Sequence, residues 1–172
     1  DGDPDAVVGG EGSTTLYRND AGTLLRTSTV LPAYQEDPDF LTMDQRSLTW
    51  ADLDNDGDLD LMLPCASDGF GGLPAMVMRN DGPGTGDAWT FTDTGQPLPL
   101  TTTAATAWAD MDGDGDLDLM FATMGQFEPP TVDLYRNDAG TLVRMDSSLA
   151  VISYGTAVLG DADGDGDFDI VV

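Results

Sequence analysis

Short apolar segments separated by polar residues run through the chain, and three of them share one design. Each is five residues long and apolar except for an aspartate at its second position: residues 59–63, 117–121 and 168–172. Such a segment is typical of a β-strand buried on both faces. A second short segment precedes each one, at 48–51, 106–109 and 157–160. The pattern therefore predicts three pairs of strands, each joined by a polar loop.

A second pattern lies between these pairs, where an apolar segment runs into Asn-Asp-Gly or Asn-Asp-Ala-Gly. It occurs at residues 16–24, 77–82 and 134–142. This turn sequence between two apolar segments is typical of a β-hairpin. We therefore expect a third and a fourth strand in each repeat.

The two patterns alternate at a spacing of roughly 50 to 60 residues, which is the spacing of four-stranded propeller blades. We predict an all-β fold of antiparallel β-propeller blades, with about three blade repeats in an incomplete propeller or blade array. Unrelated hairpins in a sandwich are the alternative, but the fixed order of the two patterns favours blades. Trp50 and Trp108 are then expected to pack in the core between neighbouring blades.

The predicted boundaries follow from this order of strands. They give a partial blade with half a loop and three strands at 1–46, complete blades at 47–103 and 104–153, and a partial blade of two strands at 154–172. Propellers close with about four to eight blades, so we expect these residues to be an excerpt of a longer chain, either a closed propeller or an extended array of blades. Exposed edge strands would otherwise invite self-association.

The polar loops place an aspartate at every second residue for nine residues. The complete loops contain Asp52, Asp54, Asp56, Asp58 and Asp60; Asp110, Asp112, Asp114, Asp116 and Asp118; and Asp161, Asp163, Asp165, Asp167 and Asp169. Carboxylates at positions 1, 3, 5 and 9, a glycine at position 6 and a main-chain carbonyl at position 7 suit Ca²⁺. An EF-hand would need a glutamate at position 12, where this chain has Leu63, Phe121 and Val172. The sequence predicts calcium in three complete loops and one partial loop, the latter formed by Asp1, Asp3 and Asp5.

The net charge of −26 changes the functional picture. With no lysine and no histidine, a nucleic-acid partner or an anionic membrane surface is excluded on charge, and no membrane span is expected. Two carboxylates about 5 Å apart repel by roughly 1 to 3 kcal/mol, depending on the effective dielectric. We therefore expect the loops to open without a cation.

These motifs resemble the FG-GAP and VCBS-type repeats of integrin alpha-chain β-propellers and of bacterial secreted and surface proteins. The similarity rests on the Asp-x-Asp-x-Asp-Gly-x-x-Asp loops, the Tyr-Arg-Asn-Asp turns and the Tyr154-Gly155 pair, and it covers essentially the whole chain. It implies side-chain ligands at loop positions 1, 3, 5 and 9 and a main-chain ligand at position 7.

The order of strands predicts two faces. The calcium loops and the Asn-Asp-Gly turns share one face, and longer connections form the other, where binding loops on rigid scaffolds often lie. Candidate ligand residues on that second face are Tyr34, Phe40, Phe70, Phe127 and Glu128. These aromatic residues are equally compatible with a role as lids over the blade edges.

The sequence favours a non-catalytic, calcium-binding module of an extracellular, cell-surface or periplasmic protein. Its role would be adhesion, protein–protein interaction or assembly, with a protein or glycan ligand on the face opposite the calcium loops. A carbohydrate-binding, lectin-like propeller, or an accessory part of a secreted polysaccharide-degrading enzyme, is the alternative. Catalysis is not expected, because the chain has no histidine or lysine base and its glutamates share no motif.

Overall fold

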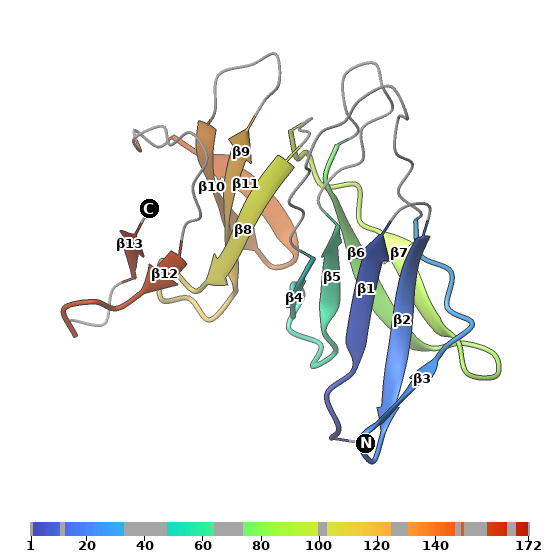
Figure 1. The fold of residues 1–172 in the computed structure, drawn as a ribbon. Coiled ribbons are helices and arrows are strands. Elements are labelled where there is room, and N and C mark those ends of the chain that lie inside the picture. The colour runs from blue at the N-terminus through green and yellow to red at the C-terminus, as the bar shows by residue number, and fades with distance from the viewer. Residues whose placement is uncertain are drawn as a thin grey trace.

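The structure is a computed structural model that describes residues 2–10, 13–32, 48–63, 74–99, 103–124, 131–146, 149, 158–164 and 168–171. These residues form β-strands in antiparallel sheets, and none of them forms a helix (Figure 1). The prediction of an all-β fold is confirmed. Among the described residues there is accordingly no helix with the length and apolar character needed to cross a bilayer.

Four antiparallel sheets follow one another along the chain. Sheet 1 has the order β1 (Ala6–Gly10), β2 (Ser13–Asp20), β3 (Thr23–Arg26). Sheet 2 has the order β4 (Thr49–Ala51), β5 (Asp60–Leu63), β6 (Met76–Pro83), β7 (Trp89–Asp93). Sheet 3 contains β8 (Thr103–Ala109), β9 (Asp118–Met124), β10 (Thr131–Asp138) and β11 (Thr141–Met145), with β8 and β11 at its edges. Sheet 4 pairs β12 (Val158–Gly160) with β13 (Asp169–Val171).

The sheets pack face to face because strands such as β5 are apolar on both sides. Leu61 and Leu63 belong to an apolar cluster shared with sheet 1, whereas Met62 belongs to one shared with sheet 3. In β9, Phe121 packs toward sheet 2 and Met120 toward sheet 4. The strands predicted to be buried on both faces are therefore observed as such in sheets 2 and 3.

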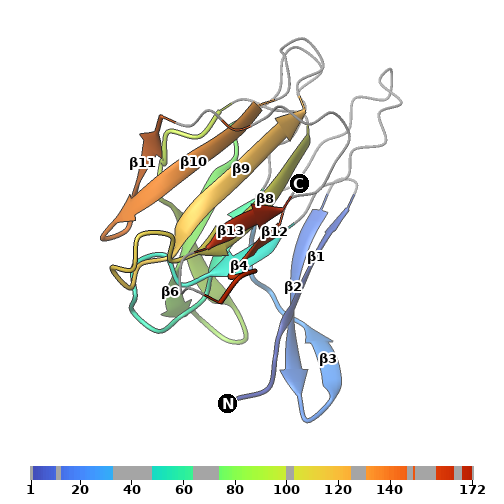
Figure 2. The same ribbon diagram turned by 90° about the vertical axis from the view of Figure 1, so that its left-hand side faces the viewer.

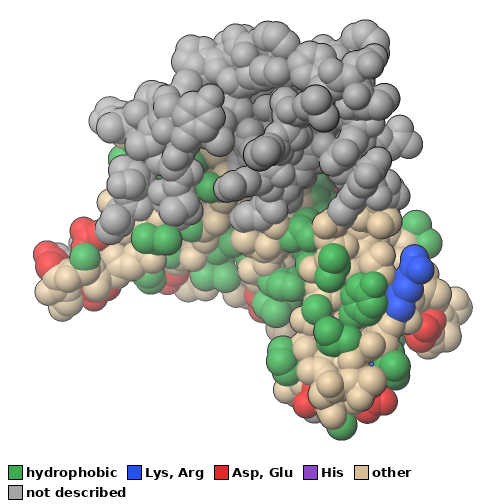
Figure 3. All heavy atoms as spheres, in the orientation of Figure 1, with side chains coloured by type: hydrophobic (Ala, Val, Ile, Leu, Met, Phe, Trp, Pro, Cys, Tyr) green, Lys and Arg blue, Asp and Glu red, His purple; other side chains and the backbone are tan. Residues whose placement is uncertain are grey.

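Strand β8 contacts both β4 and β12, and Figure 2 shows these first strands of sheets 2, 3 and 4 near one another. In the described part of the chain the sheets do not close into a ring, so the propeller and its number of blades remain predictions. Figure 3 shows hydrophobic side chains on the surface over β1 and β2. Val8 is one exposed hydrophobic residue of β1.

The two tryptophans named above pack between sheets, as predicted. Trp50 lies against the cluster shared by sheets 1 and 2, with its ring 6.5 Å from that of Phe91. Trp108 lies against the cluster shared by sheets 2 and 3, and its Nε1 donates a hydrogen bond of 3.1 Å to Thr49 Oγ1. Both indoles therefore join neighbouring sheets.

Two of the three Asn-Asp turns are two-residue hairpins. In sheet 3 the turn residues are Ala139 and Gly140, with φ angles of 49° and 88°, and Asp138 pairs with Thr141. Sheet 1 repeats this geometry at Ala21 and Gly22. Positive φ at both positions is the type I′ geometry that matches the twist of the strands. In sheet 2 the register shifts between Asn80 and Pro83, and the connection is longer.

Candidate metal centre

Each complete aspartate loop joins the first two strands of a sheet and brings three carboxylates together. One oxygen from each of positions 1, 3 and 9 lies within 4.8 Å of the other two. The groups are Asp52, Asp54 and Asp60; Asp110, Asp112 and Asp118; and Asp161, Asp163 and Asp169. The structure thus gathers three of the four side chains expected to bind a cation in each loop.

The carboxylate at position 9 is buried in the first two complete loops. Asp60 and Asp118 are each 1% exposed. Asp60 accepts backbone hydrogen bonds of 2.8 Å from Asn80 and from Leu53, one on each oxygen. Burial raises the pKa of Asp60 and of Asp118, and neighbouring loop carboxylates add to the effect. The backbone hydrogen bonds act in the opposite direction and favour the charged form, but burial has the larger effect.

The carboxylate at position 1 accepts hydrogen bonds from backbone N–H groups of its own loop. Asp52 accepts backbone hydrogen bonds of 3.1 Å from Asp56 and from Gly57. Asp110 accepts the corresponding bonds within its own loop. Gly57 has a φ of 94°, a left-handed conformation that side-chain-bearing residues rarely adopt. The glycine at position 6 is therefore required by the turn of the backbone.

Positions 5 and 7 lie outside these groups of three carboxylates. Asp56 accepts a 2.9 Å hydrogen bond from the backbone N–H of Asp58, and Asp114 accepts the equivalent bond from Asp116. The side chain of Asp116 accepts hydrogen bonds from Asn55 and from the Ala139 N–H. In the loop of sheet 3 the side chain at position 7 thus has other partners, and the family resemblance assigns the ligand role at this position to the main-chain carbonyl. Ligation by position 5 stays a prediction.

The third loop and the partial loop follow the same pattern. Ala162 N–H donates to Asp169 in the third loop, as Leu53 N–H donates to Asp60 in the first. Asp5 accepts a 2.8 Å bond from Asn19 N–H and Asp3 accepts a 2.9 Å bond from Ala21 N–H. Asp5 and Asp3 correspond to positions 9 and 7 of a complete loop. In sheet 3, Asp118 and Asp116 at these positions accept the equivalent bonds from Asn137 N–H and Ala139 N–H. Asp1, Asp165 and Asp167 lie outside the described residues.

An asparagine that the sequence interpretation treated only as a turn residue connects the turn to the loop. Its side-chain amide donates to the carbonyl of loop position 8, as Asn80 does to Leu59 and Asn137 to Leu117. Its side-chain oxygen accepts the N–H of the turn glycine. The signal was present in the sequence, because the same asparagine recurs in all three turns, at Asn19, Asn80 and Asn137.

The arginine before each turn pairs with the aspartate of the same turn. Arg79 lies 2.7 Å from Asp81, and Arg136 lies 2.7 Å from Asp138. The hydrogen bond from Arg136 lowers the pKa of Asp138, whereas that of Asp81 is lowered first by a hydrogen bond from Thr92. Both arginines also interact electrostatically with loop carboxylates, Arg79 with Asp54 and Asp60 and Arg136 with Asp112 and Asp114.

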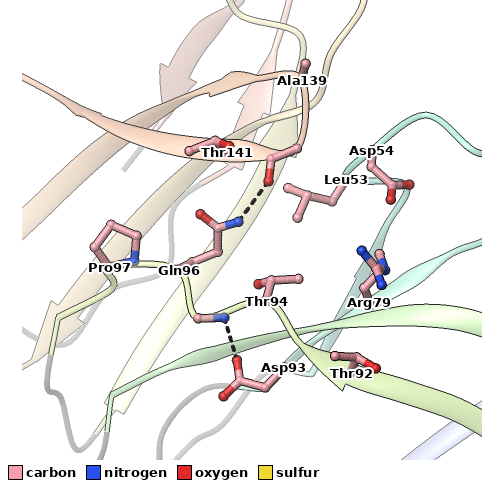
Figure 4. Close-up of a pocket in the computed structure, with 12 residues that line it drawn as sticks. Leu53, Asp54, Arg79, Thr92, Asp93, Thr94, Gln96, Pro97, Ala139 and Thr141 are labelled. Atoms are coloured by element: carbon pink, nitrogen blue, oxygen red, sulfur yellow. Dashed lines mark hydrogen bonds between the residues drawn. The ribbon is translucent and has the colours of Figure 1, made fainter.

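A cavity of about 470 Å³ lies between sheets 2 and 3 beside the first complete loop, with Asp54 and Arg79 on its wall (Figure 4). Gln96 projects across it, where its Nε2 donates 2.8 Å to the Gly140 carbonyl and its Oε1 accepts 2.9 Å from Leu142 N–H. These two bonds make Gln96 a link between the sheets.

The predicted ligand face stays a prediction. Its candidate residues, Tyr34, Phe40, Phe70, Phe127 and Glu128, all lie outside the described residues. On the calcium-loop side, the Asn-to-loop hydrogen bonds place loops and turns at one end of the sheets.

A protein-family model described as FG-GAP-like repeat matches residues 1–63 and 110–172. The matched segments contain all three complete loops and the partial loop. Neither a curated protein nor a solved structure matched the chain.

Proposed function

The chain belongs to the FG-GAP-like repeat family, and we propose that it is a non-catalytic, calcium-stabilised β-propeller module of a secreted or cell-surface protein. Its calcium ions would hold the loops that join the first two strands of each blade. Its biological role would be adhesion or assembly, through a protein or glycan ligand on the face opposite the calcium loops.

One observation carries the calcium proposal: three carboxylates converge within 4.8 Å in each loop, and in two loops the one at position 9 is buried. Backbone amides hold Asp60 and Asp118 in place, but an amide does not neutralise a carboxylate. Buried charges are normally paired with an opposite charge or bind a metal. A cation in the loop would supply that charge.

The donor set fits calcium among the common metals. All converging side chains offer oxygen, the ligand atom that Ca²⁺ and Mg²⁺ prefer, and the chain has no histidine for a zinc or copper site. Ca²⁺ accepts six to eight oxygens in flexible geometry, whereas Mg²⁺ demands a near-ideal octahedron and keeps several waters. A loop with several carboxylates and a main-chain carbonyl suits the larger ion.

Calcium binding would stabilise the fold because each loop connects two paired strands. When bound, the ion would offset the repulsion between carboxylates at positions 1, 3 and 9. Loops of this kind suit the high calcium concentration outside cells, which supports a secreted or surface location. The rigid sheets would then present the connections on the opposite face to a partner.

Calcium titration by isothermal calorimetry tests the proposal directly. We expect saturable binding at three sites, and weaker binding of Mg²⁺. The absence of calcium binding at millimolar concentrations would overturn it. A glycan array, together with capture of surface proteins on the immobilised calcium-loaded chain, would then distinguish a glycan ligand from a protein ligand.

A further inference from the structure

We propose that the neighbouring loops 52–60 and 110–118 bind calcium cooperatively, through a bridge formed by Asn137 and Asn55. This inference rests on the proposed calcium-binding function and adds a regulatory property to it. Three contacts between the loop of sheet 2 and the loop and turn of sheet 3 form the bridge.

The first contact is made by Asn137, which is 0% exposed. Its Nδ2 donates 2.8 Å to the carbonyl of Leu53, the residue between Asp52 and Asp54 in the first loop. The same amide donates 3.2 Å to Leu117 O, and the backbone N–H of Asn137 donates 2.8 Å to Asp118 in the second loop. One buried residue thus bonds both loops.

The second contact joins the loops side chain to side chain. Asn55 Nδ2 donates 2.6 Å to Asp116 Oδ1, and the other oxygen of Asp116 accepts a 3.0 Å bond from Ala139 N–H. Asp116 occupies position 7, whose main chain is expected to bind the cation. Asn55 therefore helps to fix the second loop next to its expected ligand.

The third contact is steric. A Cβ atom built on Gly140 would come within 3.3 Å of Asp54 Cβ, so the turn of sheet 3 packs closely on the position 3 aspartate of the first loop. Asp54 is one of the three converging carboxylates there. Movement of Asp54 away from its site would also remove packing from this turn.

These contacts make the order of one loop depend on the order of the other. If the empty first loop opens, Leu53 O and Asn55 move away, and the buried Asn137 amide loses an acceptor. An unpaired buried donor is unfavourable, so Asn137 would shift and loosen its hold on Asp118. Calcium in the first loop would therefore favour the calcium-binding conformation of the second loop. By thermodynamic linkage, calcium in the second loop must raise the affinity of the first loop by the same factor.

Sheet 3 supplies a natural comparison, because its loop has Gly113 where the first loop has Asn55. Both residues have positive φ, 57° for Asn55 and 78° for Gly113. The substitution Asn55→Gly should therefore keep the backbone of the loop and remove only the bond to Asp116.

Charge alone would act between the loops as well. Each bound ion makes the electrostatic potential at the other site less negative, which opposes cooperative binding. Removing aspartates from one loop likewise reduces the calcium affinity of the other loop. Such long-range effects are screened, since the Debye length falls from about 8 Å at 0.15 M salt to about 3 Å at 1 M. Coupling through the bridge should persist in high salt.

The test is a calcium titration by calorimetry in a background in which Asp161→Asn and Asp163→Asn silence the third loop. The affinity of loop 110–118 is compared with loop 52–60 intact or disabled by Asp52→Asn and Asp54→Asn. Both measurements are repeated in the presence of Asn55→Gly. They are also repeated with the control substitution Asp58→Asn, which removes one charge from the first loop but leaves its three converging carboxylates in place. Each titration is run at about 0.15 M and about 1 M salt.

We expect disabling the first loop to weaken calcium binding at loop 110–118 about five-fold or more, at both salt concentrations. Asn55→Gly should reduce that factor, whereas Asp58→Asn should not. The coupling would be overturned if disabling the first loop left the calcium affinity of loop 110–118 unchanged, or changed it only at low salt. It would also be overturned if Asn55→Gly did not reduce the change in affinity. In each case the calcium sites themselves would stand. No calcium binding in any of the proteins would overturn both the coupling and the proposed function.

Discussion

The side-chain amide of Asn137 donates a 2.8 Å hydrogen bond to the main-chain carbonyl of Leu53, which belongs to the aspartate loop of the preceding sheet. Asn137 is completely buried, and each of its side-chain polar groups has a partner. Because such a residue has no water to replace a lost bond, its contacts are expected to contribute more to stability than those of an exposed turn residue.

Asn137→Ala should therefore lower the free energy of unfolding by about 2 to 4 kcal/mol, since it leaves two carbonyls and one N–H with lost partners. Urea denaturation in saturating calcium measures the change. Asn80→Ala is the matched control, because Asn80 is partly exposed and bonds the carbonyl of Leu59 in its own sheet. Equal losses for the two variants would contradict the importance of the bond between sheets.

Within one loop, Asp60→Asn and Asp58→Asn remove the same charge from different places. Asp60 is one of the converging carboxylates, whereas Asp58 is exposed and lies outside that group. Asp60→Asn should reduce calcium affinity at this loop at least ten-fold, and Asp58→Asn only slightly, as measured by calorimetry. A similar loss in both variants would mean that overall charge, and not the arrangement of carboxylates, attracts the cation.

Ala139 adopts a φ of 49° in the type I′ turn of sheet 3, a conformation that is unfavourable for alanine by roughly 1 kcal/mol. Asparagine tolerates this conformation, and the side chain at this position is exposed. Ala139→Asn should thus raise the free energy of unfolding by about 0.5 to 1 kcal/mol. Ala139→Val, with a β-branched side chain, should lower it; the opposite order in thermal melts would argue against this turn geometry.

Gln96 bonds two backbone groups of the next sheet, so its loss should weaken the junction between sheets 2 and 3. Gln96→Ala is expected to reduce stability by about 1 to 2 kcal/mol in chemical denaturation. Gln96→Glu should be at least as damaging, because a carboxylate cannot donate to the Gly140 carbonyl. If Gln96→Glu is as stable as the unmodified chain, the bond to Gly140 contributes nothing.

Much of this architecture was predictable from short-range patterns. Segments 59–63 and 117–121 are apolar apart from one aspartate, which predicts strands buried on both faces, and they coincide with β5 (Asp60–Leu63) and the first part of β9 (Asp118–Met124). The aspartates at positions 1, 3 and 9 were also identified, because their spacing is set by one tight loop. Sequence periodicity reports such local geometry well.

The packing of Trp50 and Trp108 between repeats was predicted, but the hydrogen bonds between repeats were not, because nothing in the local sequence encodes their partners. Asn137 and Leu53 are 84 residues apart, and Gln96 and Gly140 are 44 apart. An asparagine in an Asn-Asp turn has a sufficient local explanation in the hairpin itself, which concealed its second role. Only the packing of one sheet on the next brings these partners together.

The central claim, that bound calcium holds the loops together, is tested most directly by thermal unfolding of the unmodified chain in excess calcium and in EGTA. With free calcium 100-fold above the dissociation constant, each site should add about 2.7 kcal/mol of stability. We predict a melting temperature at least 10 °C higher in calcium than in EGTA, with a smaller rise in magnesium. Melting temperatures that agree within one or two degrees in calcium and EGTA would contradict the claim.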